Sequence, residues 1–349
     1  MKWSVTATSL LMLFTANFAQ AQNYQNDQDN QEINRIVIFG DSLSDTGKMF
    51  KKMKGYLPAA PNYYQGRFSN GPVWTDLIGG LLNKKLVMVN EAEGGATAFD
   101  HNKDSKNPTY DVINNLNYEV QQFESKDHFK PDDLVVIWLG ANDYLAYHWN
   151  TEKDANHVLD SIFSKIGELS VKGTKHIMLV NLPDLGTSPQ ARIDGITREE
   201  TKISKYHNQR LSEIVASIYD PSKVKVFDIA SQFEDIMTYP QDYGIQDTVE
   251  SCFEGGYWWK PFAKKIDRPT QFHSIQRSLS PSQERAIAAN PILNQASKEY
   301  ADTFTSSYMH TTCTGHLFWD KVHPTKEVHR ILASKMADFI NNQYLNTNG

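Results

Sequence analysis

Cysteine is scarce in this chain, with only Cys252 and Cys313 among 349 residues. Neither cysteine stands in a CxxC pair, which argues against zinc-ribbon and thioredoxin-like sites. No cluster of His, Asp and Glu shows the spacing of metal ligands either. We therefore expect neither a metal ion nor any other cofactor.

Long apolar runs are also missing after the N-terminus, so no later segment is expected to span a membrane. The first 21 residues combine Lys2, a short apolar stretch that includes Leu10 to Phe14, and Ala19-Gln20-Ala21. This order is typical of a secretory signal peptide, and the apolar stretch is shorter than the ~20 residues of a membrane span. We predict cleavage after Ala21 and a secreted protein, with an N-terminal membrane anchor as the alternative.

Export decides how the two cysteines are interpreted, because a disulfide persists in an oxidising compartment. A bond between Cys252 and Cys313 would join residues 61 positions apart. In the chain-entropy view, closing a loop of that length stabilises the fold by about 4 kcal/mol. Two free thiols are the alternative.

The chain also has no excess of positive charge. The net charge is −6, and no repeat or low-complexity tract is present. A mildly acidic chain of this kind is not expected to bind nucleic acid. Its length allows one large α/β domain with an insertion, or two domains.

Short apolar runs bounded by turn residues alternate with amphipathic helical patterns along the chain. The runs predict buried strands at Ile36–Phe39, Leu86–Val89, Leu134–Leu139, His176–Val180 and Val224–Phe227. Helical periodicity is clearest over 158–169, 203–218 and 328–340. The repeated order of strand and helix predicts an α/β fold, a three-layer αβα sandwich whose five-stranded, mostly parallel sheet is covered on both faces.

This alternation stops between Ser251 and Phe318. We predict a single domain over 22–349 with an insertion over 252–313, rich in aromatic residues among Lys and Arg. Aromatic rings suit a membrane interface and basic side chains suit phosphate head groups. The hypothesis is a lid or lipid-contacting flap that makes peripheral membrane contact, and a satellite domain packed by its own aromatic residues is the alternative.

Three polar segments follow three successive predicted strands. Ser42 lies in Gly40-Asp41-Ser42-Leu43, paired glycines occur at Gly94-Gly95, and Asn142 lies in Gly140-Ala141-Asn142-Asp143. Serine hydrolysis needs a hydroxyl nucleophile and donors aimed at an oxyanion, and such groups collect at the carboxyl ends of parallel strands. Each segment alone also fits an ordinary role: a helix N-cap or turn at the serine, a tight turn at the glycines, and a cap or Asx-turn at the asparagine.

A fourth segment offers a base and its partner. In Asp320-Lys321-Val322-His323-Pro324 a carboxylate stands three residues before an imidazole. Asp320 could hold Nδ1–H of His323 and leave Nε2 to take a proton from serine, whereas a surface ion pair is the alternative. Pro324 is expected at the first position of the following helix. The rival bases are His148, His273, His310 and His316, and of these His316 lies nearby but has no carboxylate three residues before it.

The four segments occur together and in order, and here the sequence resembles the GDSL, or SGNH, lipases and esterases. The resemblance covers nearly the whole mature chain, from the first segment to the last. It implies that Ser42 is the nucleophile, that His323 is the base and that Asp320 is its partner. It further implies an oxyanion hole formed by Ser42, Gly95 and Asn142. The chain has no GxSxG motif, the nucleophile elbow of α/β-hydrolases.

Asp41 takes no part in this assignment. The aspartate stands next to Ser42 in the first segment. It is expected to be only a turn residue, and the carboxylate expected to matter is Asp320.

A narrower resemblance rests on the signal peptide, the stretch Tyr64–Trp74, the form of the second segment (Asn90–Ala96) and the cysteine-bounded insertion. These features are similar to secreted bacterial phospholipases A, lysophospholipases and glycerophospholipid:cholesterol acyltransferases. The resemblance implies phospholipid or lysophospholipid substrates, cholesterol as an acyl acceptor, and an activating protease that cuts the insertion. Water or an alcohol could take the acyl group from Ser42, so hydrolysis and transfer both stay open.

Two other functions also stay open at this level. An esterase for short-chain or carbohydrate acyl esters would use the same residues, and it is favoured if the insertion packs away from the site. A non-catalytic binding protein could keep the fold. The intact set of site residues argues against this last function: Ser42, Gly95, Asn142, Asp320 and His323.

Overall fold

A computed structural model describes residues 32–55, 57–58, 62–101, 113–254 and 313–346. The predicted signal peptide (1–21) and most of the predicted insertion (255–312) lie outside the described residues. Both therefore stay predictions, as does the division into one domain and an insertion. No helix among the described residues combines the length and the apolar character needed to cross a membrane.

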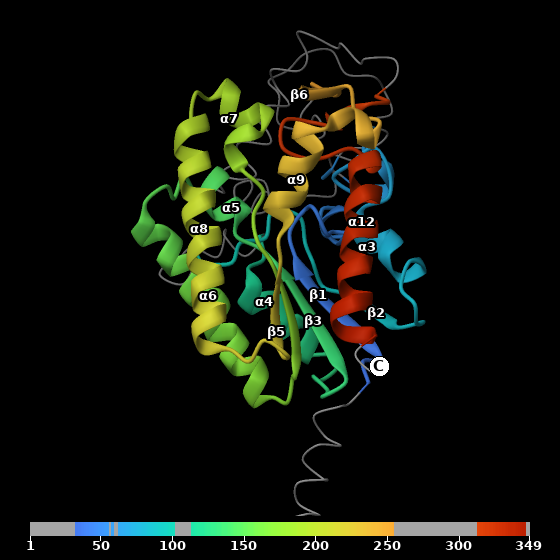
Figure 1. The fold of residues 1–349 in the computed structure, drawn as a ribbon, viewed down its shortest axis with the longest axis vertical. Helices are drawn as coiled ribbons and strands as arrows, with labels where there is room; N and C mark the ends of the chain where they lie inside the picture. The colour runs from blue at the N-terminus through green and yellow to red at the C-terminus, as the bar shows by residue number, and fades with distance from the viewer. Residues whose placement is uncertain (1–31, 56, 59–61, 102–112, 255–312, 347–349) are drawn as a thin grey trace, which may run out of the picture.

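The core is a five-stranded sheet in which every neighbouring pair of strands is parallel (Figure 1). The strand order is β2-β1-β3-β4-β5. The strands are β1 (Arg35–Gly40), β2 (Val87–Asn90), β3 (Asp133–Trp138), β4 (His176–Val180) and β5 (Val224–Phe227). All five predicted strands are confirmed, with ends that shift by at most one residue.

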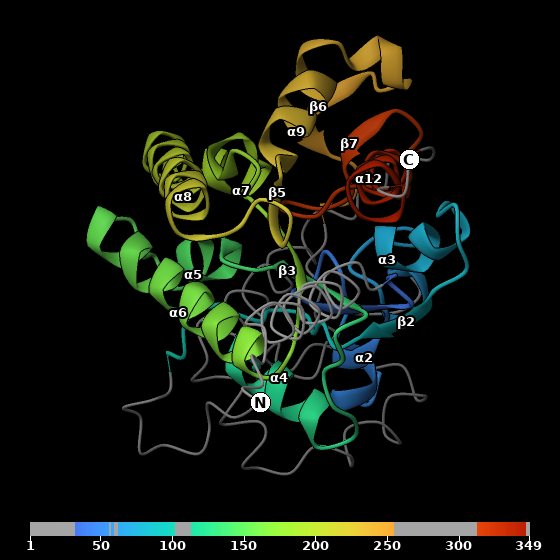
Figure 2. The same cartoon turned by 60° about the horizontal axis from the view of Figure 1, so that its bottom comes forward.

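Helices cover both faces of the sheet, which confirms the three-layer arrangement (Figure 2). Alternate strand residues enter opposite cores: Val37 and Val135 pack on one face, and Ile36 and Leu134 on the other. The first core is closed by α4 (Leu116–Glu124), α6 (Glu152–Val171) and α8 (Thr197–Ile218). The second core is closed by α3 (Trp74–Leu77), α9 (Ile229–Thr238) and α12 (Lys326–Ile340).

Shorter elements complete the described chain, and the sequence patterns did not predict them. The α-helices among them are α2 (Lys48–Lys52), α5 (Ala141–Leu145) and α7 (Pro189–Ile193). Single turns of other helices are η1 (Tyr64–Gly66), η2 (Ile78–Gly80), η4 (Leu185–Thr187), η5 (Pro240–Tyr243) and η8 (Asn341–Leu345). Such short segments carry too few residues for a helical period to be recognised.

A small second sheet and a disulfide join the two sides of the predicted insertion. Strands β6 (Asp247–Ser251) and β7 (His316–Phe318) are parallel neighbours. Cys252 and Cys313 form a disulfide, as predicted. The bonded pair packs with Tyr63, Phe253 and Trp319, and we call these five residues the disulfide cluster. The segment that follows β7 carries Asp320 and His323, so the cluster lies beside the predicted site.

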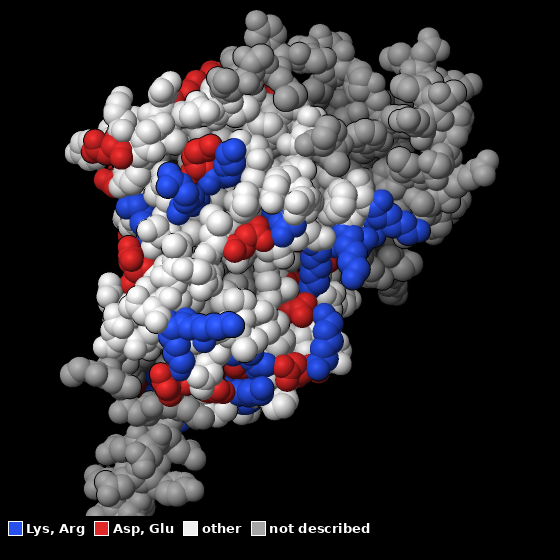
Figure 3. Space-filling view, turned by 90° about the vertical axis from the view of Figure 1, so that its right-hand side faces the viewer, with Lys and Arg blue, Asp and Glu red and all other residues white. Residues whose placement is uncertain are grey.

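Charged side chains of both signs lie interspersed on the face that Figure 3 shows. Ion pairs of the described residues include Arg67 with Asp76 at 2.7 Å and Lys84 with Glu32 at 2.8 Å. Exposed pairs of this kind contribute little to stability, about 0–1 kcal/mol each. We therefore draw no function from this face.

Candidate active site

Ser42 lies in a tight turn directly after β1. The carbonyl oxygen of Asp41 accepts the N–H groups of Ser44 and Asp45 at 3.0 Å each, and its carboxyl oxygen accepts the N–H of Leu43 at 3.0 Å. Helix α2 begins only at Lys48. Ser42 is therefore not a helix N-cap, and the structure places Asp41 in the turn, as expected.

Ser42, His323 and Asp320 form a continuous chain of hydrogen bonds. Nε2 of His323 lies 2.8 Å from Oγ of Ser42, although the two residues are 281 positions apart. Nδ1 of His323 lies 2.9 and 2.8 Å from the two carboxyl oxygens of Asp320. All three side chains are buried, so each hydrogen bond acts in a water-poor setting. The rival base His316 instead lies on β7, 4.0 Å from Asp247.

The turn that holds Asp320 differs from expectation at Pro324. Helix α12 begins at Lys326 with Thr325 as its N-cap, so Pro324 precedes the cap and is not the first helical residue. Its backbone instead forms an isolated antiparallel bridge with Phe318, and this pairing needs extended rather than helical dihedral angles. The prediction that Pro324 opens the helix is wrong by two positions. Its consequence holds, because the turn is still fixed at the sheet edge.

Gly94 and Gly95 are glycines for two different structural reasons. Gly95 has a φ of +81°, in the left-handed region that favours glycine. A Cβ on Gly94 would lie 2.3 Å from the buried ring of Phe68, so a larger residue there would force this ring to move. The N–H of Gly94 donates to the carboxylate of Asp45 at 2.8 Å. Both glycines line a pocket together with Ser42.

Asn142 lies on α5 and is tied to the glycine loop. Its side-chain amide donates to the carbonyl oxygen of Ala96 at 2.9 Å. The next residue, Asp143, accepts the N–H groups of Ala98 and Phe99 at 2.8 and 3.1 Å. An asparagine amide carries two N–H groups, so one fixes the loop and the other can serve an oxyanion. The structure thus brings all five predicted site residues to one pocket or its immediate support.

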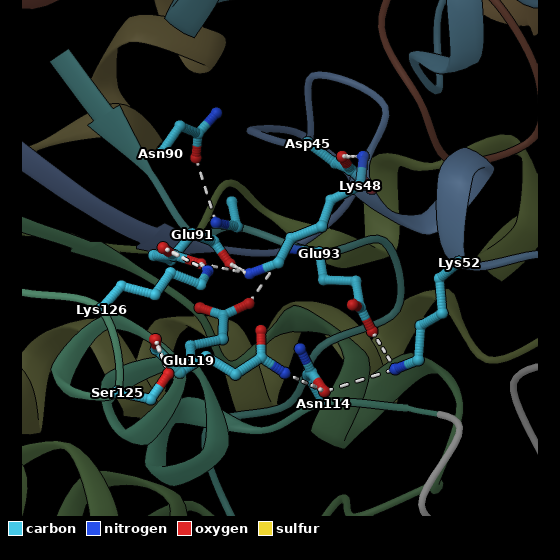
Figure 4. Close-up of polar contacts among 12 residues, drawn as sticks. Asp45, Lys48, Lys52, Asn90, Glu91, Glu93, Asn114, Glu119, Ser125 and Lys126 are labelled. Atoms are coloured by element: carbon cyan, nitrogen blue, oxygen red, sulfur yellow. Dashed lines mark hydrogen bonds and ion pairs between the residues drawn. The ribbon is translucent and has the colours of Figure 1, made fainter.

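Glu119 supports this edge of the sheet and was missed from the sequence (Figure 4). Its two carboxyl oxygens accept the N–H of Gly40, at the end of β1, and the N–H of Glu93, each at 3.0 Å. The side chain is fully buried, and this burial raises its pKa well above the usual range. A single carboxyl group on α4 therefore joins the turn before Ser42 to the loop before Gly95.

Lysines surround the neighbouring glutamates in the same region (Figure 4). Lys48 pairs with Glu91 and Lys52 with Glu93, each at 2.6 Å. Burial still raises the pKa of Glu93. These pairs offset part of the cost of burying carboxylates near the site.

Comparison with known proteins decides the family. A sequence model described as "GDSL-like Lipase/Acylhydrolase" matches residues 36–336. The chain belongs to this GDSL-like family. The resemblance seen in the four segments is thereby confirmed, together with the acyl-ester hydrolase or acyltransferase class of the enzyme.

Several members of the GDSL-like family are similar to this chain over most of its length. A phosphatidylcholine-sterol acyltransferase of Aeromonas hydrophila is 49% identical over 312 residues, which cover 89% of this chain and 91% of that protein. The secreted effector protein SseJ of Salmonella typhimurium is 28% identical, covering 90% of this chain and 65% of that protein. A thermolabile hemolysin of Vibrio parahaemolyticus is 25% identical, covering 89% of this chain and 65% of that protein.

The stretch Tyr64–Trp74 of this GDSL-like protein braces the site from two sides. The hydroxyl of Ser69 donates to the carbonyl oxygen of Pro324 at 2.9 Å, beside His323. The indole N–H of Trp74 donates to the hydroxyl of Ser44 at 3.1 Å, beside Ser42. This stretch therefore holds the nucleophile turn and the histidine turn relative to each other.

The pocket of this GDSL-like protein is largely apolar. Its polar lining side chains are those of Asp41, Ser42, Asn142, Gln190 and His323. The apolar lining residues are Leu43, Leu57, Phe68, Ile113, Ala141, Leu145, Ala146, Pro183, Leu185 and Val322. Among the described residues no group of three or more His, Cys, Asp or Glu could hold a metal ion.

Asp41 makes the stability of the fold depend on pH. Burial raises the pKa of this carboxyl from 3.8 to about 7. The folded state then holds a proton that the unfolded state has lost between about pH 4 and pH 7, so stability falls as pH rises through this window. Asp41→Asn is neutral throughout, and its side-chain oxygen can still accept the N–H of Leu43.

We expect Asp41→Asn to match the wild type in free energy of unfolding near pH 4. At pH 8 it should exceed the wild type by up to about 4 kcal/mol. Urea denaturation at both pH values measures the difference. Equal stabilities of the two proteins at pH 8 would contradict the assignment.

The predicted membrane contact and the predicted activating protease concern residues 255–312. These residues lie outside the described part of the chain. Both stay predictions.

Proposed function

We propose that this protein is a secreted serine lipase and acyltransferase. It takes a fatty acyl group from a glycerophospholipid or lysophospholipid and forms an ester with Ser42. The observation that carries the proposal is the 2.8 Å contact between Oγ of Ser42 and Nε2 of His323, together with the Asp320 carboxylate at Nδ1. This is the arrangement that a serine nucleophile, its base and the group orienting the base require.

In the first half of the reaction, Oγ of Ser42 attacks the ester carbonyl and its proton passes to Nε2 of His323. The carbonyl oxygen becomes negative and receives hydrogen bonds from the N–H groups of Ser42 and Gly95 and from the amide of Asn142. The bond to the glycerol oxygen then breaks, and the leaving alcohol takes the proton from His323. Asp320 stabilises the imidazolium that exists between these two transfers.

In the second half, an acceptor hydroxyl attacks the acyl ester of Ser42 and gives its proton to His323. Water as acceptor releases a free fatty acid, and cholesterol releases a cholesteryl ester. Ser42 recovers its proton from His323 as the acyl bond breaks. Both outcomes use the same residues, so the acceptor decides between hydrolysis and transfer.

The apolar pocket supports a fatty acyl chain as the group transferred. Leu43, Leu57, Phe68, Leu145 and Leu185 line it, and burying methylene groups against such side chains gains about 0.8 kcal/mol each. An acetyl group or a sugar would gain little there. The 49% identical relative is named a phosphatidylcholine-sterol acyltransferase, which also supports lipid and sterol as the substrates.

The proposed export supports the same function, because the phospholipid and cholesterol of other membranes lie outside the producing cell. Export is inferred from the N-terminal pattern that ends at Ala21. One relative is named a secreted effector protein. We propose that the mature chain begins at Gln22 and contacts membranes peripherally through the insertion, and that a protease activates it there.

The deciding experiment incubates the purified mature protein with vesicles of phosphatidylcholine and cholesterol and measures free fatty acid and cholesteryl ester. We expect both products from the wild type and neither from Ser42→Ala. Lysophosphatidylcholine and a short acetyl ester serve as further substrates. Cleavage of the acetyl ester with no attack on either phospholipid would refute the lipase function and favour a short-chain esterase.

A further inference from the structure

The carboxylate of Asp320 has a hydrogen-bond donor outside the proposed triad. The phenol hydroxyl of Tyr63 donates to its Oδ2 at 2.8 Å, across 257 positions of sequence. Both side chains are buried, with Tyr63 only 2% exposed. A hydrogen bond donated to a carboxylate is charge-assisted, and this one lies in a water-poor setting.

The two oxygens of Asp320 are held in different ways. Oδ1 accepts the backbone N–H groups of Val322 and His323 at 2.9 and 2.8 Å, within its own turn. Oδ2 accepts the hydroxyl of Tyr63 at 2.8 Å, and Nδ1 of His323 lies 2.8 Å from Oδ2 and 2.9 Å from Oδ1. The backbone thus fixes one oxygen, while Tyr63 fixes how the carboxylate is rotated toward the imidazole.

Tyr63 is itself held by three aromatic rings. Its ring meets those of Phe253, Trp319 and Phe68 edge-on, at centroid distances of 5.8, 6.1 and 6.4 Å. Phe253 follows Cys252 and donates its N–H to the carbonyl oxygen of Trp319 at 2.6 Å. The disulfide cluster therefore sets the position of a phenol that contacts the proposed triad.

We propose that Tyr63 is a positioning residue for the proposed triad and that it acts by holding the Asp320 carboxylate. The inference rests on the proposed function, since it concerns how His323 gains and loses a proton. With its phenol donor, Asp320 shares its negative charge between the imidazole and Tyr63. Without that donor, the negative charge of the carboxylate is stabilised less by the phenol, so the carboxylate stabilises the imidazolium of His323 more strongly. The carboxylate also rotates more freely.

This proposal predicts a shift in the pH dependence of kcat/KM for Tyr63→Phe. The imidazolium of His323 becomes harder to deprotonate, so the acid limb moves to higher pH, by about half a pH unit. The looser carboxylate lowers kcat about fivefold at the plateau, with KM unchanged. If Tyr63 had only a structural role, Tyr63→Phe would lower the stability of the fold but would leave the acid limb of kcat/KM unchanged.

Other titratable groups act on His323 and must be separated from this effect. Two such groups in the described chain interact electrostatically with His323, namely Asp41 in the nucleophile turn and His329 on α12. Burial lowers the pKa of His329 to about 3, so it stays neutral over the acid limb. Asp41 has a pKa of about 7 and titrates in the same range. The Tyr63→Phe comparison is therefore repeated in the Asp41→Asn background, where the shift should persist.

Tyr344→Phe is the matched control. Tyr344 is also buried, and its hydroxyl donates to the carbonyl oxygen of Ile177 at 2.9 Å, near the start of β4 and not at the carboxyl ends of the strands, which the site residues follow. Tyr344→Phe, like Tyr63→Phe, removes a buried phenol hydroxyl that donates a hydrogen bond. We expect the acid limb of Tyr344→Phe to coincide with that of the wild type.

The test measures kcat and KM from pH 4.5 to pH 9 for the mature proteins on a short chromogenic ester. A proton NMR spectrum at low pH follows the Nδ1 proton between His323 and Asp320, which should move downfield in Tyr63→Phe even if activity is low. Acid limbs and Nδ1 resonances that coincide for Tyr63→Phe, Tyr344→Phe and the wild type would overturn the proposal. Activity that survives in Ser42→Ala would overturn the proposed function instead, so the two failures are distinguishable.

Discussion

Ser42→Ala should lower kcat for ester hydrolysis by on the order of 10⁶-fold. Alanine removes the oxygen that lies 2.8 Å from Nε2 of His323, so no acyl-enzyme can form. The remaining rate comes from the oxyanion donors and substrate binding alone. Hydrolysis of a short chromogenic ester by the purified mature protein measures the loss.

Ser44→Ala is the matched control for this prediction. Ser44 lies in the same turn and is fully buried, but its hydroxyl accepts the indole N–H of Trp74, whereas the hydroxyl of Ser42 lies beside Nε2 of His323. We expect this variant to lose about 1 kcal/mol of stability and to keep its activity within a few-fold. A Ser42→Ala protein that is as active as Ser44→Ala would show that the nucleophile lies elsewhere.

Asp320→Asn is expected to lower kcat by about 10⁴-fold while the protein stays folded. Oδ1 of the asparagine can still accept the N–H groups of Val322 and His323, so the turn is kept. The new amide nitrogen takes the place of Oδ2 beside Nδ1 of His323 and donates a hydrogen bond to it. The imidazole then carries its own proton on Nε2, where it can no longer accept one from Ser42.

Asp228→Asn makes the same chemical change at the end of another strand. Asp228 follows β5 and accepts the N–H of Ser231 at 3.2 Å as the N-cap of α9. We expect nearly unchanged kcat for this control and an unchanged circular dichroism spectrum for both variants. Retention of more than a tenth of wild-type kcat by Asp320→Asn would contradict the role of Asp320 as partner of His323.

The five strands could be predicted, although not their order, because strands in the middle of a parallel sheet are almost wholly apolar. β4 and β5 match the predicted strands to the residue, although β5, at the edge of the sheet, is buried only at its two ends. Helix α4 was missed because its buried face is not wholly apolar. Glu119 interrupts its apolar stripe of Leu116, Val120 and Phe123, although it is as buried as they are.

The site likewise contains residues that the sequence predicted and residues that it misplaced or missed. The blocks around Ser42, Gly95, Asn142, Asp320 and His323 could be predicted because each stands just after a strand or in a short motif of defined chemistry. Pro324 was misplaced because its extended backbone depends on pairing with Phe318. Tyr63 carries no motif, and its contact with Asp320 depends on ring packing against Phe253 and Trp319.

The sequence by itself therefore determined the parallel sheet, through local periodicity, and the GDSL-like family, through the resemblance of its four segments. It also predicted the residues of the proposed site. Only the tertiary structure decided which groups support them. Glu119 reaches Gly40 across 79 positions and Tyr63 reaches Asp320 across 257. A buried hydrogen bond of this kind is specified by where the surrounding core places two distant segments, and no local pattern records it.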